Sequence, residues 1–173
     1  TTRSLFFGGV SSGDTRHNVI EYIDINSTGN AADFGDLSSA KRSLMSASSS
    51  TRAVAAGGID SNLLNVMEYV TIASTGNVTD FGDLTLAVVQ GTGTGNSTRG
   101  LFQLGQSANS IINTIDYISI ASTGNSQDFG DLTVARAYGE DSAVSSPTRG
   151  VFAGGYSSSA LNTIDYVTIG STG

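Results

Sequence analysis

Residues 148–173 read TRGVFAGGYSSSALNTIDYVTIGSTG, and variants of this text occur four times along the chain. Each copy opens with a Thr-Arg pair, and a tyrosine follows an acidic residue further on. The arginines are Arg3, Arg52, Arg99 and Arg149, and the tyrosines are Tyr22, Tyr69, Tyr117 and Tyr166. Because successive copies lie about 48 residues apart, the sequence predicts an array of supersecondary units that stack on one another.

A third repeated motif, D-F-G-D-L, supplies Phe34, Phe81 and Phe129, and is absent after Tyr166. The chain therefore divides into repeats at 1–50, 51–97 and 98–147 and a partial repeat at 148–173. Since the three earlier copies all continue into D-F-G-D-L, we expect this chain to be an excerpt of a longer repeat protein. The alternative is that another chain completes the array.

The composition excludes several classes of partner. The 173 residues include 22 glycines, no cysteine and no tryptophan, and the net charge is −7. Non-specific nucleic-acid binding needs basic patches, and docking on anionic lipid needs them too. No apolar run approaches the roughly 20 residues of a membrane span. We therefore expect no nucleic-acid partner and no membrane insertion.

Each full copy contains four short segments bounded by turn residues, which is the pattern of β-strands. The first lies at 4–7, 53–56, 100–104 or 150–153, and the second at 19–25, 66–72, 114–120 or 163–169. D-F-G-D-L is the third, and the fourth lies at 43–47, 86–90 or 134–138. Four-stranded antiparallel units at this period predict an all-β fold, a segment of a β-propeller. We expect the tyrosines and phenylalanines to pack between blades.

An acidic residue precedes each repeated tyrosine and, by strand alternation, shares a face with aliphatic side chains. These acids are Glu21, Glu68, Asp116 and Asp165. A buried carboxylate is costly unless it is paired. The repeated arginine recurs once per unit as well, so we predict a structural ion pair between the two.

The order of these features resembles the kelch motif: a strand ending in Gly-Gly, then a tyrosine, an aromatic and a basic residue. Copy one supplies Gly8-Gly9, Tyr22, Phe34 and Arg42, and copy three supplies Leu104-Gly105, Tyr117, Phe129 and Arg136. Copy two has Val88 or Val89 at the basic position, and phenylalanine replaces the usual tryptophan. The resemblance implies a divergent, kelch-like propeller.

The wording of the repeats is also similar to that of repeats in structural proteins of tailed phages, marine ones in particular. This resemblance implies a component of a virion surface or tail, located on the virion or otherwise outside cells. Its partners would be other virion proteins or a host surface receptor, together with neighbouring blades or copies of the same chain.

We assign no catalytic, cofactor-binding or metal-binding residue. The paired acids of the D-F-G-D motifs are Asp33/Asp36, Asp80/Asp83 and Asp128/Asp131. They suggest Ca²⁺, but two carboxylates per motif favour turn capping over a dedicated site. His17 is the single histidine and is expected in a solvated loop. Residues 91–96 (GTGTGN) lack the lysine and following helix of a phosphate loop and are expected to be a flexible connection. Some kelch-family proteins are copper oxidases with a tyrosine–cysteine cofactor, which a chain without cysteine lacks.

The sequence therefore favours a non-enzymatic structural or interaction module. Loops that differ between copies, at 11–17, 59–62, 106–110 and 156–160, would form its contact surface, with 91–96 on another edge. The alternative is a bacterial surface adhesin or carbohydrate-binding propeller, for which Tyr156 is the one candidate loop aromatic. An enzyme would need a cluster of ionisable residues in a central channel, and the repeats contain no such unique cluster.

Overall fold

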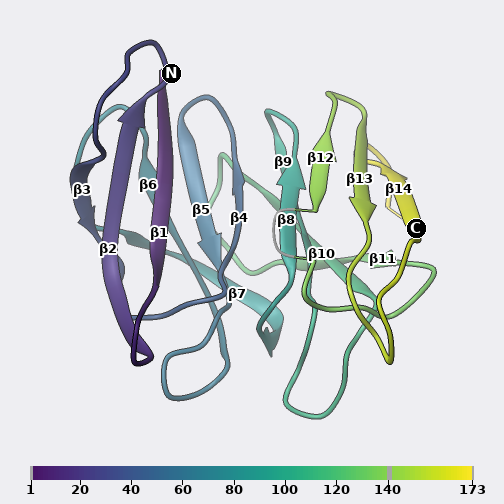
Figure 1. Cartoon of the computed structure of the whole chain (residues 1–173). Coiled ribbons are helices and arrows are strands. Elements are labelled where there is room, and N and C mark those ends of the chain that lie inside the picture. The colour runs from purple at the N-terminus through teal and green to yellow at the C-terminus, as the bar shows by residue number, and fades with distance from the viewer. Residues whose placement is uncertain (1, 140–141, 173) are drawn as a thin grey trace.

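The computed structural model describes residues 2–139 and 142–172. Within them, fourteen strands and no helix form four antiparallel sheets (Figure 1). The all-β prediction is confirmed. The first sheet contains β1 (Arg3–Ser11), β2 (Thr15–Asp24) and β3 (Ala32–Asp36), and the second contains β4 (Met45–Ser48), β5 (Arg52–Ala56), β6 (Leu64–Thr71) and β7 (Thr79–Val88). The third contains β8 (Thr92–Gly95), β9 (Arg99–Gln103), β10 (Thr114–Ser119) and β11 (Gln127–Asp131), and the fourth β12 (Ala143–Ser145), β13 (Arg149–Ala153) and β14 (Ile164–Thr168).

The strand just before each internal Thr-Arg pair joins the sheet of the next repeat, and not the sheet of its own repeat. β4 pairs with β5, β8 with β9 and β12 with β13, so each of these strands crosses from one sequence repeat into the next sheet. β8 lies beside β4 and β12 (Figure 1). The leading strands of sheets 2, 3 and 4 are therefore neighbours, while the other strands of each sheet lie progressively further from them.

Two of the three predicted fourth segments are wrong. Residues 86–90 continue β7 as far as Val88, and 134–138 contain no strand. The segment at 91–96, expected to be a flexible connection, instead contains β8. Close packing explains the first glycine of β8. A Cβ on Gly93 would lie 2.1 Å from the backbone oxygen of Ser46 in β4. Because two backbones pass this closely, glycine is required despite its poor strand propensity.

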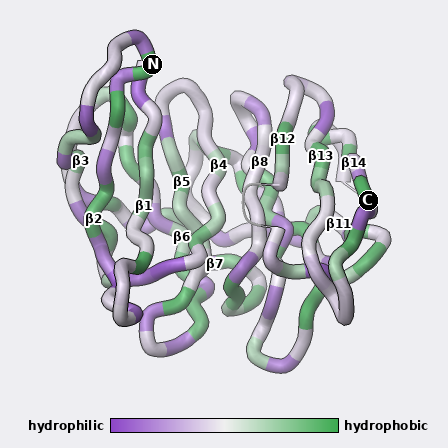
Figure 2. Tube along the Cα trace, viewed as in Figure 1, coloured by the Kyte–Doolittle hydropathy of each residue, from purple (hydrophilic) through white to green (hydrophobic). Residues whose placement is uncertain are grey.

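The hydrophobic core lies between consecutive sheets. Three clusters of buried side chains fill the spaces between sheets 1 and 2, 2 and 3, and 3 and 4. Between sheets 2 and 3, for example, Met67 and Phe81 pack with Phe102. Apolar residues recur along the strands of all four sheets (Figure 2). Each inner sheet is therefore apolar on both faces, because each face covers a neighbour.

Candidate functional site

Three of the four repeated arginines, Arg3, Arg52 and Arg99, connect consecutive sheets. Each guanidinium lies over the ring of the tyrosine of its own sheet, with 4.5 to 4.8 Å between Cζ and the ring centroid. In sheet 2, Arg52 also donates from Nη1 to the carbonyl oxygens of Ile120 (3.2 Å) and Ala121 (2.8 Å) of sheet 3. Arg3 and Arg99 donate in the same way to Ile72 and Ile169. The repeated arginine is thus a cation–π partner of the tyrosine and a donor to the next sheet.

The buried acids have other partners, so the predicted pairing with these arginines is wrong. Lys41 Nζ lies 2.6 Å from Glu68 Oε2, and Arg136 Nη1 lies 2.9 Å from Asp165 Oδ2. Asp116 accepts hydrogen bonds from the backbone N–H and the hydroxyl of Thr85 instead. All these partners belong to the segment after D-F-G-D-L of the previous repeat. The acid points to the previous sheet, whereas the arginine donates to the next.

Glu21, the acid of the first sheet, has no preceding sheet among the described residues to supply such a partner. Its side chain is exposed. In copy one the residue that pairs with the acid of the next sheet is Lys41, one position before Arg42, which the kelch resemblance placed at the basic position. Arg42 lies 3.3 Å from Asp14 in a partly exposed ion pair.

The D-F-G-D and S-T-G-N motifs contact each other across the sheets. Gly124 donates to the carbonyl of Phe81 (2.7 Å), and Asn125 Oδ1 accepts from the backbone N–H of Asp83 (3.0 Å). A Cβ on Gly82, whose φ is 137°, would lie 2.5 Å from the backbone of Gly124. Residues 74–77 contact 33–36 in the same manner. The carboxylates of these motifs do not converge: no described group of three or more His, Cys, Asp or Glu side chains could hold a metal ion.

The aromatic positions complete the repeated contacts. Tyr69 meets Phe81 edge to face, with ring centroids 5.9 Å apart. The pairs Tyr22–Phe34 and Tyr117–Phe129 have the same geometry. The three phenylalanines are buried, whereas Tyr166 is exposed on the last sheet. These phenylalanines, with Tyr22, Tyr69 and Tyr117 packed beside them, belong to the three clusters between consecutive sheets. The repeated aromatic residues therefore serve contacts between sheets.

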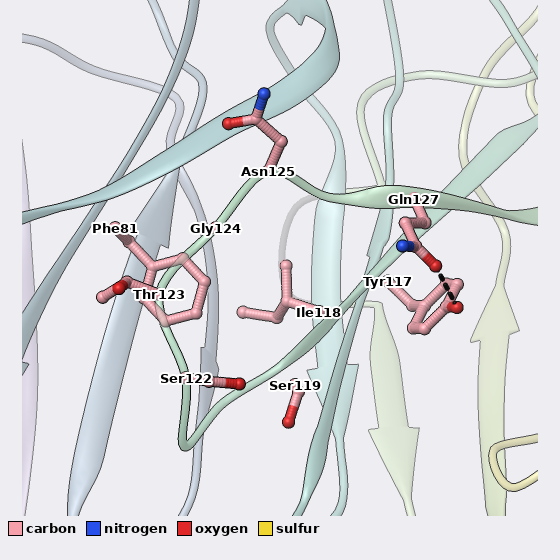
Figure 3. A pocket seen from close by; sticks show the side chains of 9 residues that line it. All are labelled: Phe81, Tyr117, Ile118, Ser119, Ser122, Thr123, Gly124, Asn125 and Gln127. Carbon is pink, nitrogen blue, oxygen red and sulfur yellow. Dashed lines mark hydrogen bonds between the residues drawn. The ribbon is translucent and has the colours of Figure 1, made fainter.

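A hollow of about 310 Å³ lies beside Tyr117, between β10 and the S-T-G-N turn (Figure 3). Polar groups line much of it, among them Ser122, Asn125 and Gln127, and the hydroxyl of Tyr117 donates to Gln127 Oε1. A similar hollow of about 240 Å³ lies at the equivalent place beside Tyr69. Because this hollow recurs with the repeat, it follows from the turn contact and is not particular to one copy.

A second region differs from copy to copy. The connections β1–β2, β5–β6, β9–β10 and β13–β14 all lie at the same end of the sheets, here called the loop end (Figure 1). These contain the four variable loops that the sequence singled out. Residues 11–17 are less of a loop than expected, since β1 ends at Ser11 and β2 begins at Thr15. His17 lies on β2, exposed, with Nε2 3.0 Å from Ser11 Oγ.

A hollow of about 310 Å³ opens at the loop end between sheets 2 and 3. Its lining includes Arg42, Gln90, Gln106 and Tyr138. Tyr138 is 54% exposed and meets Tyr156 edge to face, with centroids 6.0 Å apart. Two solvent-exposed aromatic rings beside amide side chains form a surface that can bind a partner by stacking and hydrogen bonding.

The variable loops are held by local hydrogen bonds. In the β5–β6 connection, Asn62 donates its backbone N–H to Asp60 Oδ1 at 2.9 Å. This bond, with help from the neighbouring Ser61, lowers the pKa of the Asp60 carboxyl. At neutral pH the loop is therefore ordered by a charged acceptor.

Sequence reasoning missed Tyr138, which it placed inside a fourth strand. The residue instead occupies a left-handed turn, with φ of 56°, and Ser43 and Gln90 have similar φ at the equivalent positions. Its backbone N–H donates to Gln90 O (3.0 Å). The turn is a repeated feature, but only copy three places an aromatic there. An aromatic at a position where the other copies have Ser and Gln was the available signal.

No protein-family model matches the chain, and no match to a curated protein was found. The described residues contain no helix long and apolar enough to cross a membrane.

Proposed function

We propose that the chain is a non-enzymatic interaction module, built as a segment of a kelch-like β-propeller whose sheets are the blades. The propeller hypothesis is supported by four antiparallel sheets that stack in chain order, with β8 lying beside both β4 and β12. The observation that carries the function is a separation of roles. The residues that repeat form the contacts between sheets, whereas the variable loops lie together at the loop end (Figure 1).

The setting we propose is a virion surface or tail, with another virion protein or a host receptor as the partner. Its support is the similarity of the repeats to those of phage structural proteins. The test is mass spectrometry of purified particles from the source. Peptides of this chain should co-purify with the particles, and their restriction to the soluble cell fraction would contradict the setting without affecting the fold.

The exposed pair Tyr138 and Tyr156 favours a second candidate, a carbohydrate-binding propeller such as a bacterial surface adhesin. Sugar rings present apolar C–H faces that pack on aromatic rings, and their hydroxyls hydrogen-bond to amides such as those of Gln90 and Gln106. Tyr138 and Gln106 line the same hollow, and Tyr156 packs against Tyr138. A saccharide would therefore find both kinds of contact in one place.

Binding of the wild-type chain to a glycan array and to intact host cells separates these candidates. The double variant Y138A/Y156A should weaken binding about tenfold or more, since each lost aromatic contact is worth about 1 kcal/mol. The control is T28A, a change in the β2–β3 connection at the opposite end of the sheets (Figure 1). Binding to cells that free saccharides do not compete would favour a protein receptor. Binding that survives the double substitution would exclude this part of the loop end.

A further inference from the structure

Sheet 1 has an outward face, the face turned away from sheet 2, that exposes apolar side chains buried elsewhere in the repeat. Phe6 is 50% exposed, whereas its equivalents Ala55, Phe102 and Phe152 are at most 1% exposed. Ile25 is 65% exposed, whereas its equivalents Ile72, Ile120 and Ile169 are at most 4% exposed. In sheets 2, 3 and 4 the preceding sheet covers these positions.

Sheet 4 has the complementary outward face, turned away from sheet 3. Ile164 is 69% exposed, whereas Ile20, Met67 and Ile115 at the same repeat position are fully buried. Val144 is 66% exposed, and its equivalents Ala47 and Thr94 are 5% and 9% exposed. Tyr166 is 62% exposed. In sheets 1, 2 and 3, the sheet that follows covers these positions.

The polar contacts are divided between the two faces in the same way. Arg149 lies over Tyr166 with 4.7 Å between Cζ and the ring centroid, as the other arginines lie over their tyrosines. Its side chain donates to no carbonyl of the described residues, while Arg99 donates to Ile169 O. The carbonyl at the matching repeat position on sheet 1 is that of Ile25. The two outward faces are thus the donor half and the acceptor half of one interface that occurs three times inside the molecule.

We propose that the outward face of sheet 4 binds the outward face of sheet 1 of a second copy of the chain, head to tail. Ile164 and Tyr166 of one copy would cover Phe6 and Ile25 of the other, and Arg149 would donate to the carbonyl of Ile25. A contact between two different faces is heterologous, so it leads to a ring or to a chain of copies. Such a surface continues an interface that already exists, and large exposed apolar patches mark interaction sites.

This junction lacks two of the internal contacts. Sheet 4 has no described counterpart of β3, β7 or β11, so no D-F-G-D strand receives the turn at residues 27–30. No counterpart of Lys41 reaches Glu21 either. We therefore expect an association weaker than the internal interfaces, which depends on protein concentration.

Analytical ultracentrifugation of the purified chain over a range of concentrations tests the proposal. The variant I25E blocks the sheet 1 face, and I164E blocks the sheet 4 face. Both residues are exposed, so the fold should survive, and circular dichroism should match the wild type. Wild type should associate increasingly with concentration, whereas each variant alone should remain monomeric.

The decisive sample is an equal mixture of I25E and I164E. I25E retains the sheet 4 face and I164E retains the sheet 1 face, so the mixture should form a one-to-one dimer and nothing larger. The control Y138A, at the loop end, should associate like the wild type. A wild type that stays monomeric throughout, a mixture that stays monomeric, or a single variant that dimerises with itself would each overturn the proposal.

Discussion

The interface between sheets 1 and 2 and the interface between sheets 2 and 3 satisfy a buried acid in two different ways. Both have an arginine stacked on a tyrosine, an edge-to-face Tyr–Phe pair and a glycine passing a glycine. At the first, Glu68 is 3% exposed and pairs with Lys41, which is 1% exposed. At the second, Asp116 is fully buried and forms no ion pair with a described residue.

The two interfaces differ in the residues at two equivalent positions. Where the first interface has Lys41, the second has Val88, and where the first has Val78, the second has Ser126. Ser126 Oγ donates to Asp116 Oδ2, and Thr85 adds a hydroxyl and a backbone N–H. The buried carboxylate thus has a partner at both interfaces, a cation at the first and neutral hydrogen-bond donors at the second. This agrees with the high cost of burying an unpartnered charge.

The largest expected effect comes from removing the cation. K41M should lower the free energy of unfolding by about 3–5 kcal/mol, because it leaves the Glu68 carboxylate buried without its partner. Urea denaturation followed by circular dichroism measures this. The double variant K41M/E68Q should recover much of the loss, since a neutral amide needs no counter-charge. A loss below about 1 kcal/mol for K41M would mean that solvent reaches Glu68.

A smaller effect is expected where neutral donors serve the acid. T85V should cost about 1–3 kcal/mol, because Asp116 loses one hydroxyl donor and keeps Ser126 and a backbone N–H. The matched control is T133V, whose hydroxyl donates to Asp165 at 2.7 Å. Asp165 retains Arg136, so T133V should cost less than T85V in the same denaturation experiment. Equal losses would show that the cation contributes nothing at the last interface.

The smallest effect concerns a contact that both interfaces share. R52A removes the stacking on Tyr69 and two hydrogen bonds to sheet 3, whereas R149A removes only the stacking on Tyr166. R52A should therefore lower the free energy of unfolding by about 1 kcal/mol more than R149A. The measurement belongs at a concentration low enough to exclude self-association. Indistinguishable losses would mean that the carbonyl contacts add no stability.

Much of the fold could be predicted from the repeats. The first and second strands of every copy, and the third strand of the three full copies, lie where the apolar segments indicated, because turn residues bound them locally. The fourth strand was misplaced, since β8 has the sequence T-G-T-G and no local preference for a strand. Its glycines become intelligible only beside the backbone of Ser46. The candidate site was predicted in part: the variable loops and Tyr156 were singled out, and Tyr138 was not.

The period, the strand segments and the equivalence of residues between copies follow from the sequence alone, because short stretches of chain carry them. The sheet that each leading strand joins, and the direction in which each repeated side chain points, depend on contacts between distant parts of the chain. Arg52 donates hydrogen bonds to Ile120 and Ala121, which lie 68 and 69 positions further along the chain. Glu68 instead accepts a hydrogen bond from Ser38, in the previous repeat. Acid and arginine recur at the same period, so spacing could not tell which neighbour each one contacts. The stacking of the sheets gives the acid and the arginine different neighbours. One face of a sheet contacts the preceding repeat, and the other face contacts the following one.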